Sequence, residues 1–211
     1  TTISGYAELL SSGMLQKPED ATEFGRKILA ESRRLLTLIE DIIRLSRLDE
    51  GVRGEVTPVD LTALIQHCVQ KLTPAAQNAQ VSISASGNDP VLISGDHALL
   101  EEMLTNLLEN GIKYNHAGGY VRARAEMADG RAVVTVADNG VGIAPEDQQR
   151  VFERFYRVDK SRSKQTGGTG LGLSIVKHGA QVHHAQIAMQ SALGEGTTIT
   201  LTFPAQSSGK K

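Results

Sequence analysis

Apolar residues recur at steps of three and four along the first 50 residues, the spacing of one face of an α-helix. The pattern predicts a short helix over about Thr2–Ser12 and a long helix from Asp20 to about Leu48. Gly13 and Pro18 mark the turn between them. A helix of about 28 residues would be roughly 42 Å long. Its apolar positions are Phe24, Ile28, Leu35, Leu38, Ile39, Ile42, Leu45 and Leu48.

A two-helix hairpin with so broad an apolar stripe cannot bury it alone. Packing against a second copy as a four-helix bundle would cover the stripe, so we expect a homodimer through residues 1–50. The alternative is a hairpin that lies on the C-terminal part of its own chain.

Beyond residue 50 short helices and strands alternate. We expect a linker over residues 51–57, a domain over residues 58–205 and a polar tail over residues 206–211. Several hairpins among the helices favour an α+β fold, with helices on one face of a mostly antiparallel sheet. Asp60 and Asp96 can cap helices, and Asp129-Gly130 is a strong hairpin turn. The expected helices are Leu61–Leu72, Asp96 to about Tyr114, a short one near Glu146–Phe152, and Gly172–His183; the expected strands are Val81–Ala85, Val91–Ile93, Tyr120–Met127, Ala132–Ala137, Gln186–Gln190 and Thr197–Phe203.

Composition excludes several classes of protein. Lys and Arg number 22 against 24 Asp and Glu, a net charge of −2, which gives no signal for nucleic acid or an anionic membrane surface. The single cysteine, Cys68, excludes an internal disulfide and a Cys-based zinc cluster, and we expect it to be a small core residue. No apolar run approaches the roughly 20 residues of a membrane span. We therefore expect no nucleic-acid partner, no membrane contact within this chain and a cytoplasmic location.

Two glycine-rich segments could contact a ligand. Asp138-Asn139-Gly140-Val141-Gly142 follows an expected strand, and its carboxylate could hold an amino group by accepting hydrogen bonds from it; a plain turn is the alternative. Gly167-Gly168-Thr169-Gly170-Leu171-Gly172 leads into an expected helix, whose free N–H groups would favour phosphates; a flexible hinge is the alternative. The second segment is neither a Walker loop nor a dinucleotide fingerprint.

One expected helix carries polar residues that could complete such a site. Asn106, Asn110, Lys113 and Tyr114 occupy neighbouring positions of one face. An asparagine oxygen suits Mg²⁺, the lysine could neutralise phosphate, and the tyrosine could stack on a base. A solvated polar face is the alternative.

Aromatic residues gather just before the second glycine segment. Phe152, Phe155 and Tyr156 are three of the eight aromatic residues, and the simplest interpretation is that they anchor packing. Residues 158–166, which follow Arg157, are polar and cationic and predict a mobile lid.

Taken in chain order, these segments resemble the ATP-binding domain of sensor histidine kinases. Asn106–Asn110 is similar to the N box and Phe152–Tyr156 to the F box. Asp138–Gly142, Gly168–Gly172 and Gly194-Glu195-Gly196-Thr197 are similar to the glycine boxes. Thr1–Leu10 resembles the sequence just after the phosphoacceptor box in the phosphate- and cell-wall-sensing type, and Glu31–Leu48 the second helix of the dimerisation domain.

The resemblance implies a GHKL-type (Bergerat) α/β sandwich after a truncated dimerisation and phosphotransfer hairpin. It implies binding of Mg-ATP and transfer of the γ-phosphoryl group to a histidine, for relay to an Asp of a response-regulator receiver domain. The parent protein would be anchored in the bacterial membrane. The implied roles are adenine-amine binding by Asp138, Mg²⁺ binding by Asn110 with Asn106 close to the metal or its water, phosphate contact by Lys113, adenine cover by Tyr114, γ-phosphate contact by Arg157, and pocket and lid shaping by Gly140, Gly142, Gly168, Thr169, Gly170, Leu171 and Gly172.

The chain departs from the family pattern in several places. The phosphoacceptor of the family stands in a His-Glu-x-x-x-Pro box, which would lie shortly before Thr1, and none of the six histidines has that context. We therefore expect this chain alone not to become phosphorylated on histidine. Gly111 replaces a usual Ala, which weakens a helix by about 1 kcal/mol. Gly179 replaces an apolar residue and His184-Ala185 a Gly pair, and we expect His183-His184 to be a surface helix end. The six histidines are His67, His97, His116, His178, His183 and His184.

Two other functions remain open on the sequence. An ATPase of the gyrase, chaperone or mismatch-repair type would carry a general-base Glu where Asn106 stands. A non-catalytic module that binds nucleotide weakly, dimerises and recruits a partner would fit the missing acceptor box.

Overall fold

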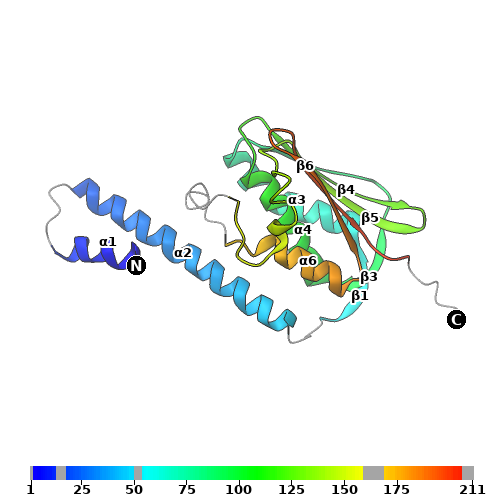
Figure 1. Cartoon of the computed structure of the whole chain (residues 1–211), viewed down its shortest axis with the longest axis horizontal. Helices are drawn as coiled ribbons and strands as arrows, with labels where there is room; N and C mark the ends of the chain where they lie inside the picture. Colours follow the sequence, from blue (N-terminus) through cyan, green and yellow to red (C-terminus); the bar gives the residue numbers. More distant parts are fainter. Residues whose placement is uncertain (1, 13–17, 50–53, 159–168, 206–211) are drawn as a thin grey trace.

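The computed structural model describes residues 2–12, 18–49, 54–158 and 169–205. Figure 1 shows a helical hairpin and a separate sandwich of helices on a sheet. The α+β class expected from the sequence is confirmed. No helix in these four ranges is long and apolar enough to cross a membrane.

The hairpin consists of α1 (Thr2–Ser11) and α2 (Pro18–Asp49), and α2 has 32 residues against the 28 expected. Tyr6 of α1 stacks on Phe24 of α2 with ring centroids 5.2 Å apart, and Lys27 Nζ lies 5.4 Å from the Tyr6 centroid. These contacts hold the helices together near the turn. The large apolar side chains on α2 stay exposed, by 39% to 61%, at Leu29, Leu35, Leu36, Ile39, Ile42 and Ile43. The chain's own sandwich therefore does not cover this stripe.

The main sheet has five strands in the order β2-β4-β5-β7-β6. β2 pairs parallel with β4, and the other neighbours are antiparallel, in agreement with the expected sheet. The Asp129-Gly130 turn between β4 and β5 has φ of 50° and 72° at its two residues, as a two-residue hairpin turn requires. The strands are β2 (Ser82–Ser86), β4 (Tyr120–Ala128), β5 (Arg131–Asp138), β6 (Gln186–Ala192) and β7 (Gly196–Thr202).

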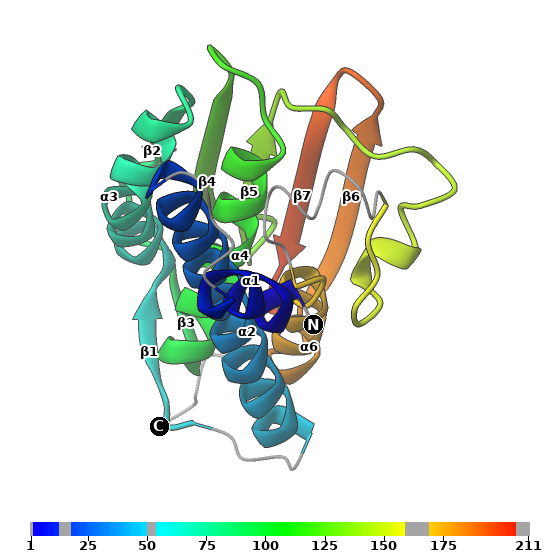
Figure 2. The same ribbon diagram turned by 90° about the vertical axis from the view of Figure 1, so that its left-hand side faces the viewer.

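Three helices cover one face of this sheet: α3 (Leu61–Asn78), α4 (His97–Lys113) and α6 (Gly172–Val182) (Figure 2). β1 (Val56–Asp60) and β3 (Leu92–Asp96) form a small antiparallel pair. Alternate strand residues such as Val121, Val134 and Leu201 are buried under α4, whose inward side chains include Met103, Leu104 and Leu108. This core sets the position of α4 on the sheet, and with it the polar face that α4 carries.

Four expectations about the elements need correction. The expected linker at 51–57 is partly strand, because β1 begins at Val56 and pairs with β3. The helix expected to stop at Leu72 runs through Pro74 to Asn78, since Leu72 and Ala76 are both buried on it. The helix near Glu146–Phe152 is a 3-10 turn, η1, only at Arg150–Phe152. His183 is not at the surface but buried, with 9% of it exposed.

Candidate functional site

The last residue of β5 places a carboxylate at the edge of the core. Asp138 pairs across the sheet with Val121 of β4 and Thr197 of β7 and is half-buried. Asp138 lies two residues after Val136 and four after Val134, so it is on the same, helix-covered face of the strand. Burial raises the pKa of Asp138, an effect partly offset by the backbone amides of Gly140 and Thr197. A carboxylate has about four acceptor sites and these amides are two donors, so Asp138 can accept a further hydrogen bond from a ligand.

Glycines bring the end of α4 against the loop after β5. The backbone N–H of Val141 donates to the Tyr114 carbonyl at 3.0 Å. A Cβ on Gly140 would lie 2.4 Å from that carbonyl oxygen, and a Cβ on Gly111 would lie 3.0 Å from Val121 and 3.5 Å from Asp138 Cβ. Glycine at 111 therefore seats α4 directly on β4, beside the carboxylate.

Two cations lie close together at the end of α4. Lys113 Nζ is 5.2 Å from the Tyr114 ring centroid. Burial lowers the pKa of Lys113, and the Arg157 charge lowers it further. Burial also raises the pKa of the Tyr114 hydroxyl, while Arg157 acts in the opposite direction. Nε and Nη2 of Arg157 are buried without a hydrogen-bond partner. Buried donors of this kind are costly unless an acceptor meets them, so the arrangement suits an anion.

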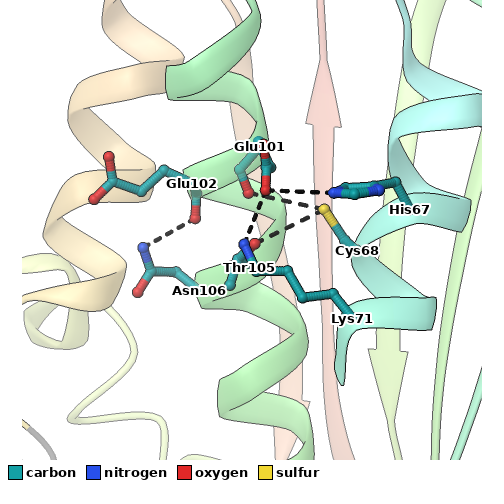
Figure 3. A network of polar contacts seen from close by, with 7 residues as sticks. All are labelled: His67, Cys68, Lys71, Glu101, Glu102, Thr105 and Asn106. Atoms are coloured by element: carbon teal, nitrogen blue, oxygen red, sulfur yellow. Dashed lines mark hydrogen bonds and ion pairs between the residues drawn. The ribbon is translucent and has the colours of Figure 1, made fainter. Parts of the chain in front are cut away.

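The two asparagines lie further back along α4. Asn106 Nδ2 donates to the Glu102 carbonyl at 3.0 Å (Figure 3). Its Oδ1 lies 2.7 Å from where a Cβ on Gly172 would stand, so the first residue of α6 must be small. Asn110 is half-buried one turn further along the helix. Two amide side chains thus lie on the same helix as Lys113, next to the start of α6.

Polar contacts with α3 fix the rotation of α4 about its axis. Glu101 accepts a hydrogen bond from Lys71 at 2.9 Å, and Thr105 Oγ1 donates to Cys68 Sγ at 3.8 Å. Cys68 is fully buried, as expected. Figure 3 shows Asn106 on the side of α4 opposite to these contacts. The α3 contacts therefore direct Asn106 toward α6.

The segment around Phe155 joins the beginning of α6. Its N–H donates to the Gly170 carbonyl at 2.9 Å, and φ is 63° at Phe155 and 77° at Gly170. Leu171 is fully buried, and its N–H approaches Thr169 Oγ1 at 3.4 Å. Gly168 and residues 159–166 of the expected lid lie outside the described residues. Arg157 is thereby held near the start of α6 as well as near Lys113.

Gly142, one of the residues expected to shape the nucleotide pocket, packs against another part of the sheet. Its φ is 69°, and a Cβ there would collide with the Ala192 carbonyl. The glycine thus lets the loop after β5 pack against the β6–β7 turn, which is an internal contact. The structure brings together the ends of α4 and β5, with Arg157, and puts Asn106 against Gly172.

Several residues that brace these loops could not be recognised from the sequence. Asn139 Oδ1 accepts from the Tyr120 N–H at 2.6 Å, and Asn115 Nδ2 donates to the carbonyls of Gly111 and Tyr120. Gln148 Nε2 donates to the carbonyls of Ile143 and Ser191. Asn139 and Gln148 each reach a partner far along the chain, Tyr120 and Ser191, whereas Asn115 binds carbonyls four and five residues away in turns that follow no recognised motif.

The fold and these residues define a nucleotide-binding ATPase-type domain, and comparison with known proteins gives the class. The chain belongs to the family described as histidine kinase-, DNA gyrase B- and HSP90-like ATPase, whose model matches residues 95–207. Residues 1–51 match the His Kinase A (phospho-acceptor) domain. The expected resemblance to sensor histidine kinases is confirmed.

Among curated proteins, the sensor-like histidine kinase SenX3 of Mycolicibacterium smegmatis is 42% identical over 207 residues, 96% of this chain and 54% of that protein. The sensor histidine kinase YkoH of Bacillus subtilis is 32% identical over 209 residues, 99% of this chain and 45% of that protein. The chain spans about half the length of these curated relatives.

Solved structures show the same fold. Full-length ShkA in complex with AMPPNP is 28% identical, with a TM-score of 0.73 over 96% of this chain and 42% of that one. The mycobacterial sensor histidine kinase MprB is 29% identical, with a TM-score of 0.60 over 71% of this chain and 97% of that one.

Proposed function

We propose that this chain is the catalytic core of a sensor histidine kinase. It binds Mg-ATP and transfers the γ-phosphoryl group to a histidine, for relay to an aspartate of a response-regulator receiver domain. The observation that carries the proposal is Arg157, whose buried Nε and Nη2 have no partner and whose charge acts on Lys113. Phosphate oxygens would satisfy both groups. The AMPPNP complex of the related ShkA supports a nucleotide here.

The rest of the site fits the other end of the nucleotide. Asp138 would accept a hydrogen bond from the adenine amine, and Tyr114 would cover the base. Gly140 keeps the loop close to Tyr114 without a side chain in the way. Gly142, Gly168, Gly170 and Gly172, with Thr169 and Leu171, would shape the wall and the lid.

The donor set of α4 fits Mg²⁺. Because Nδ2 of Asn106 is held by the Glu102 carbonyl, its Oδ1 remains toward the start of α6. Asn110 would be the direct ligand, with Asn106 acting close to the metal or its water. When bound, Mg²⁺ supplies neutralisation of charge on the phosphate oxygens.

The chain's own residues would catalyse the transfer mainly by position and charge. Arg157 and Lys113 would hold the phosphates in line with the incoming imidazole and stabilise the charge that develops on them. None of the six histidines stands in a His-Glu-x-x-x-Pro box, so we place the acceptor outside these residues. The alternative function is a non-catalytic module, which would bind nucleotide but transfer no phosphoryl group.

We also propose the domain organisation and the partners. Residues 1–50 would form a homodimeric four-helix bundle, supported by the exposed Ile39 and Ile42. The ATP-binding domain would occupy residues 58–205 together with β1, after a short linker and before a tail at 206–211. The substrate ATP fits a cytoplasmic location for this part of a membrane-anchored parent.

Arg157→Gln tests the proposal. Loss of charge-assisted hydrogen bonds worth about 1.5–3 kcal/mol should weaken Mg-ATP binding roughly 10- to 150-fold in calorimetry. Arg131→Gln removes an exposed arginine at the other end of β5 and should leave affinity unchanged. Equal affinity in Arg157→Gln and the parent would remove the support for a phosphate site here.

A further inference from the structure

The ring of His183 is fixed from both nitrogens at the end of α6. Nδ1 lies 2.8 Å from the Gly179 carbonyl, and Nε2 lies 3.0 Å from the backbone N of Asp96. A carbonyl only accepts and an amide N–H only donates. The ring is therefore neutral in this arrangement, with its proton on Nδ1 and its Nε2 accepting.

The surroundings are shaped to hold the ring. A Cβ on Gly95 would lie 2.8 Å from His183 Cδ2 and 2.8 Å from Leu100, so only glycine leaves room beside the imidazole. Phe203 meets the ring edge-on, with centroids 6.3 Å apart and planes at 78°. The side chain is thus locked in one orientation.

Asp96 connects this ring to two other parts of the chain. Its Oδ1 accepts from the Leu99 N–H at 3.1 Å and caps α4, and its Oδ2 accepts from the Gly54 N–H at 2.9 Å. Gly54 precedes β1, on the side from which the hairpin arrives. One residue of β3 therefore joins the end of α6, the start of α4 and the segment that leads in from the hairpin.

We infer that protonation of His183 weakens the connection between the end of α6 and the segment at Gly54. We refer to His183 in this role as a proton-sensitive latch. A second proton, on Nε2, would set an N–H against the Asp96 N–H and break that contact. The carboxylate of the same residue, Asp96, would then be an acceptor for the imidazolium, in competition with the amides of Leu99 and Gly54. Mild acid would loosen all three connections together.

Among the groups named around the ring, the Asp96 carboxylate is the acidic one that a protonated His183 would meet. On β3 the charged group is Asp96 itself. His97 begins α4 and His184 follows His183, and both are exposed. Leu100 and Phe203, which also lie beside the ring, are apolar. The inference does not rest on kinase activity, because its geometry lies at the opposite end of α4 and α6 from the nucleotide residues.

Nuclear magnetic resonance of the ¹⁵N-labelled whole chain tests the latch. Between about pH 8 and about pH 5.5, where an imidazole changes charge, the amide signals of Asp96 and Gly54 should shift together. In His183→Gln the side-chain oxygen can still accept from the Asp96 N–H but does not titrate, so this joint shift should vanish. His184→Gln, which removes the neighbouring exposed histidine, should retain it.

An unchanged joint shift in His183→Gln would overturn the inference. If circular dichroism shows that His183→Gln does not fold, the unsubstituted chain provides the test. The ¹⁵N signals of its imidazole rings are then followed, with His184→Gln used to assign them. A His183 Nε2 that is protonated at about pH 8 would refute the latch, and so would a His183 titration that leaves the Gly54 amide unmoved.

Discussion

Replacement of Asp138 by asparagine should move nucleotide affinity and stability in opposite directions. The variant keeps one oxygen for the Gly140 amide, which now donates at 2.8 Å, and puts an NH₂ group where the second carboxylate oxygen was. The adenine amine would then face a donor. A buried donor without an acceptor costs about 1–3 kcal/mol, so Mg-ATP affinity should fall roughly 5- to 150-fold.

The stability change follows from the raised pKa of Asp138. Burial disfavours the ionised carboxylate, so the folded protein takes up a proton more readily than the unfolded chain does. The stability that this proton confers is complete below the ordinary pKa of about 3.9 and is lost as pH rises through the raised pKa. Asparagine carries no charge at any pH. The variant should therefore be more stable than the parent at neutral pH, and this advantage should shrink toward about pH 4.

Calorimetric titration with Mg-ATP and urea unfolding at about pH 7.5 and about pH 4 measure both effects. Asp129→Asn is the matched control, since it makes the same change at an exposed turn residue with a φ of 50°, which asparagine tolerates. Unchanged affinity in Asp138→Asn would refute the role in adenine binding. If stability is lower at both pH values, the loss of an amide contact such as that of Thr197 outweighs the relief of the buried charge; an advantage that does not shrink toward about pH 4 would refute the argument from burial.

Four further predictions test the helices and the chemistry. Ile39→Asp with Ile42→Asp should give monomers by light scattering where the parent is a dimer, because charges would enter the interface. Gly179→Ala should cost about 1–3 kcal/mol in urea unfolding, since its Cβ would meet Met103 Sδ. Gly25→Ala, with nothing within 4 Å, should instead stabilise by about 0.5–1 kcal/mol. Radiolabelled ATP should leave no acid-labile label on this chain alone, and a label would show that one of its own histidines accepts phosphate.

The sequence predicted best what local chemistry determines. Asp60 caps α3 through the Thr62 amide at 2.9 Å, and Asp96 caps α4. Both caps are expected where an acidic residue stands just before apolar residues at helical spacing. The turn at Asp129-Gly130 also formed as expected. The α4 residues proposed for the site share one face because helical spacing alone puts them there.

Features that depend on a distant neighbour were missed. In the sequence Gly179 is only a departure from the usual apolar residue, but in the structure it is the position where α6 passes Met103 of α4. The prediction that His183 lies at the surface was wrong, because its partners, Asp96 and Gly95, come from β3. Helical periodicity identifies an apolar face but does not say which residue of another element will meet it.

The place of Asp138 in the sheet has a consequence during synthesis. Its strand lies between β4 and β7, and β7 leaves the ribosome well after β5. Thr197, its partner across the sheet, comes 59 positions after Asp138, so translation at about 5–20 residues per second delays that pairing by roughly 3–12 s. During that interval β5 has a free edge, and the proposed nucleotide site lacks the Thr197 amide that contacts Asp138. If Asp138 binds the nucleotide as proposed, ATP would stabilise chains in which this pairing has formed over partly made ones.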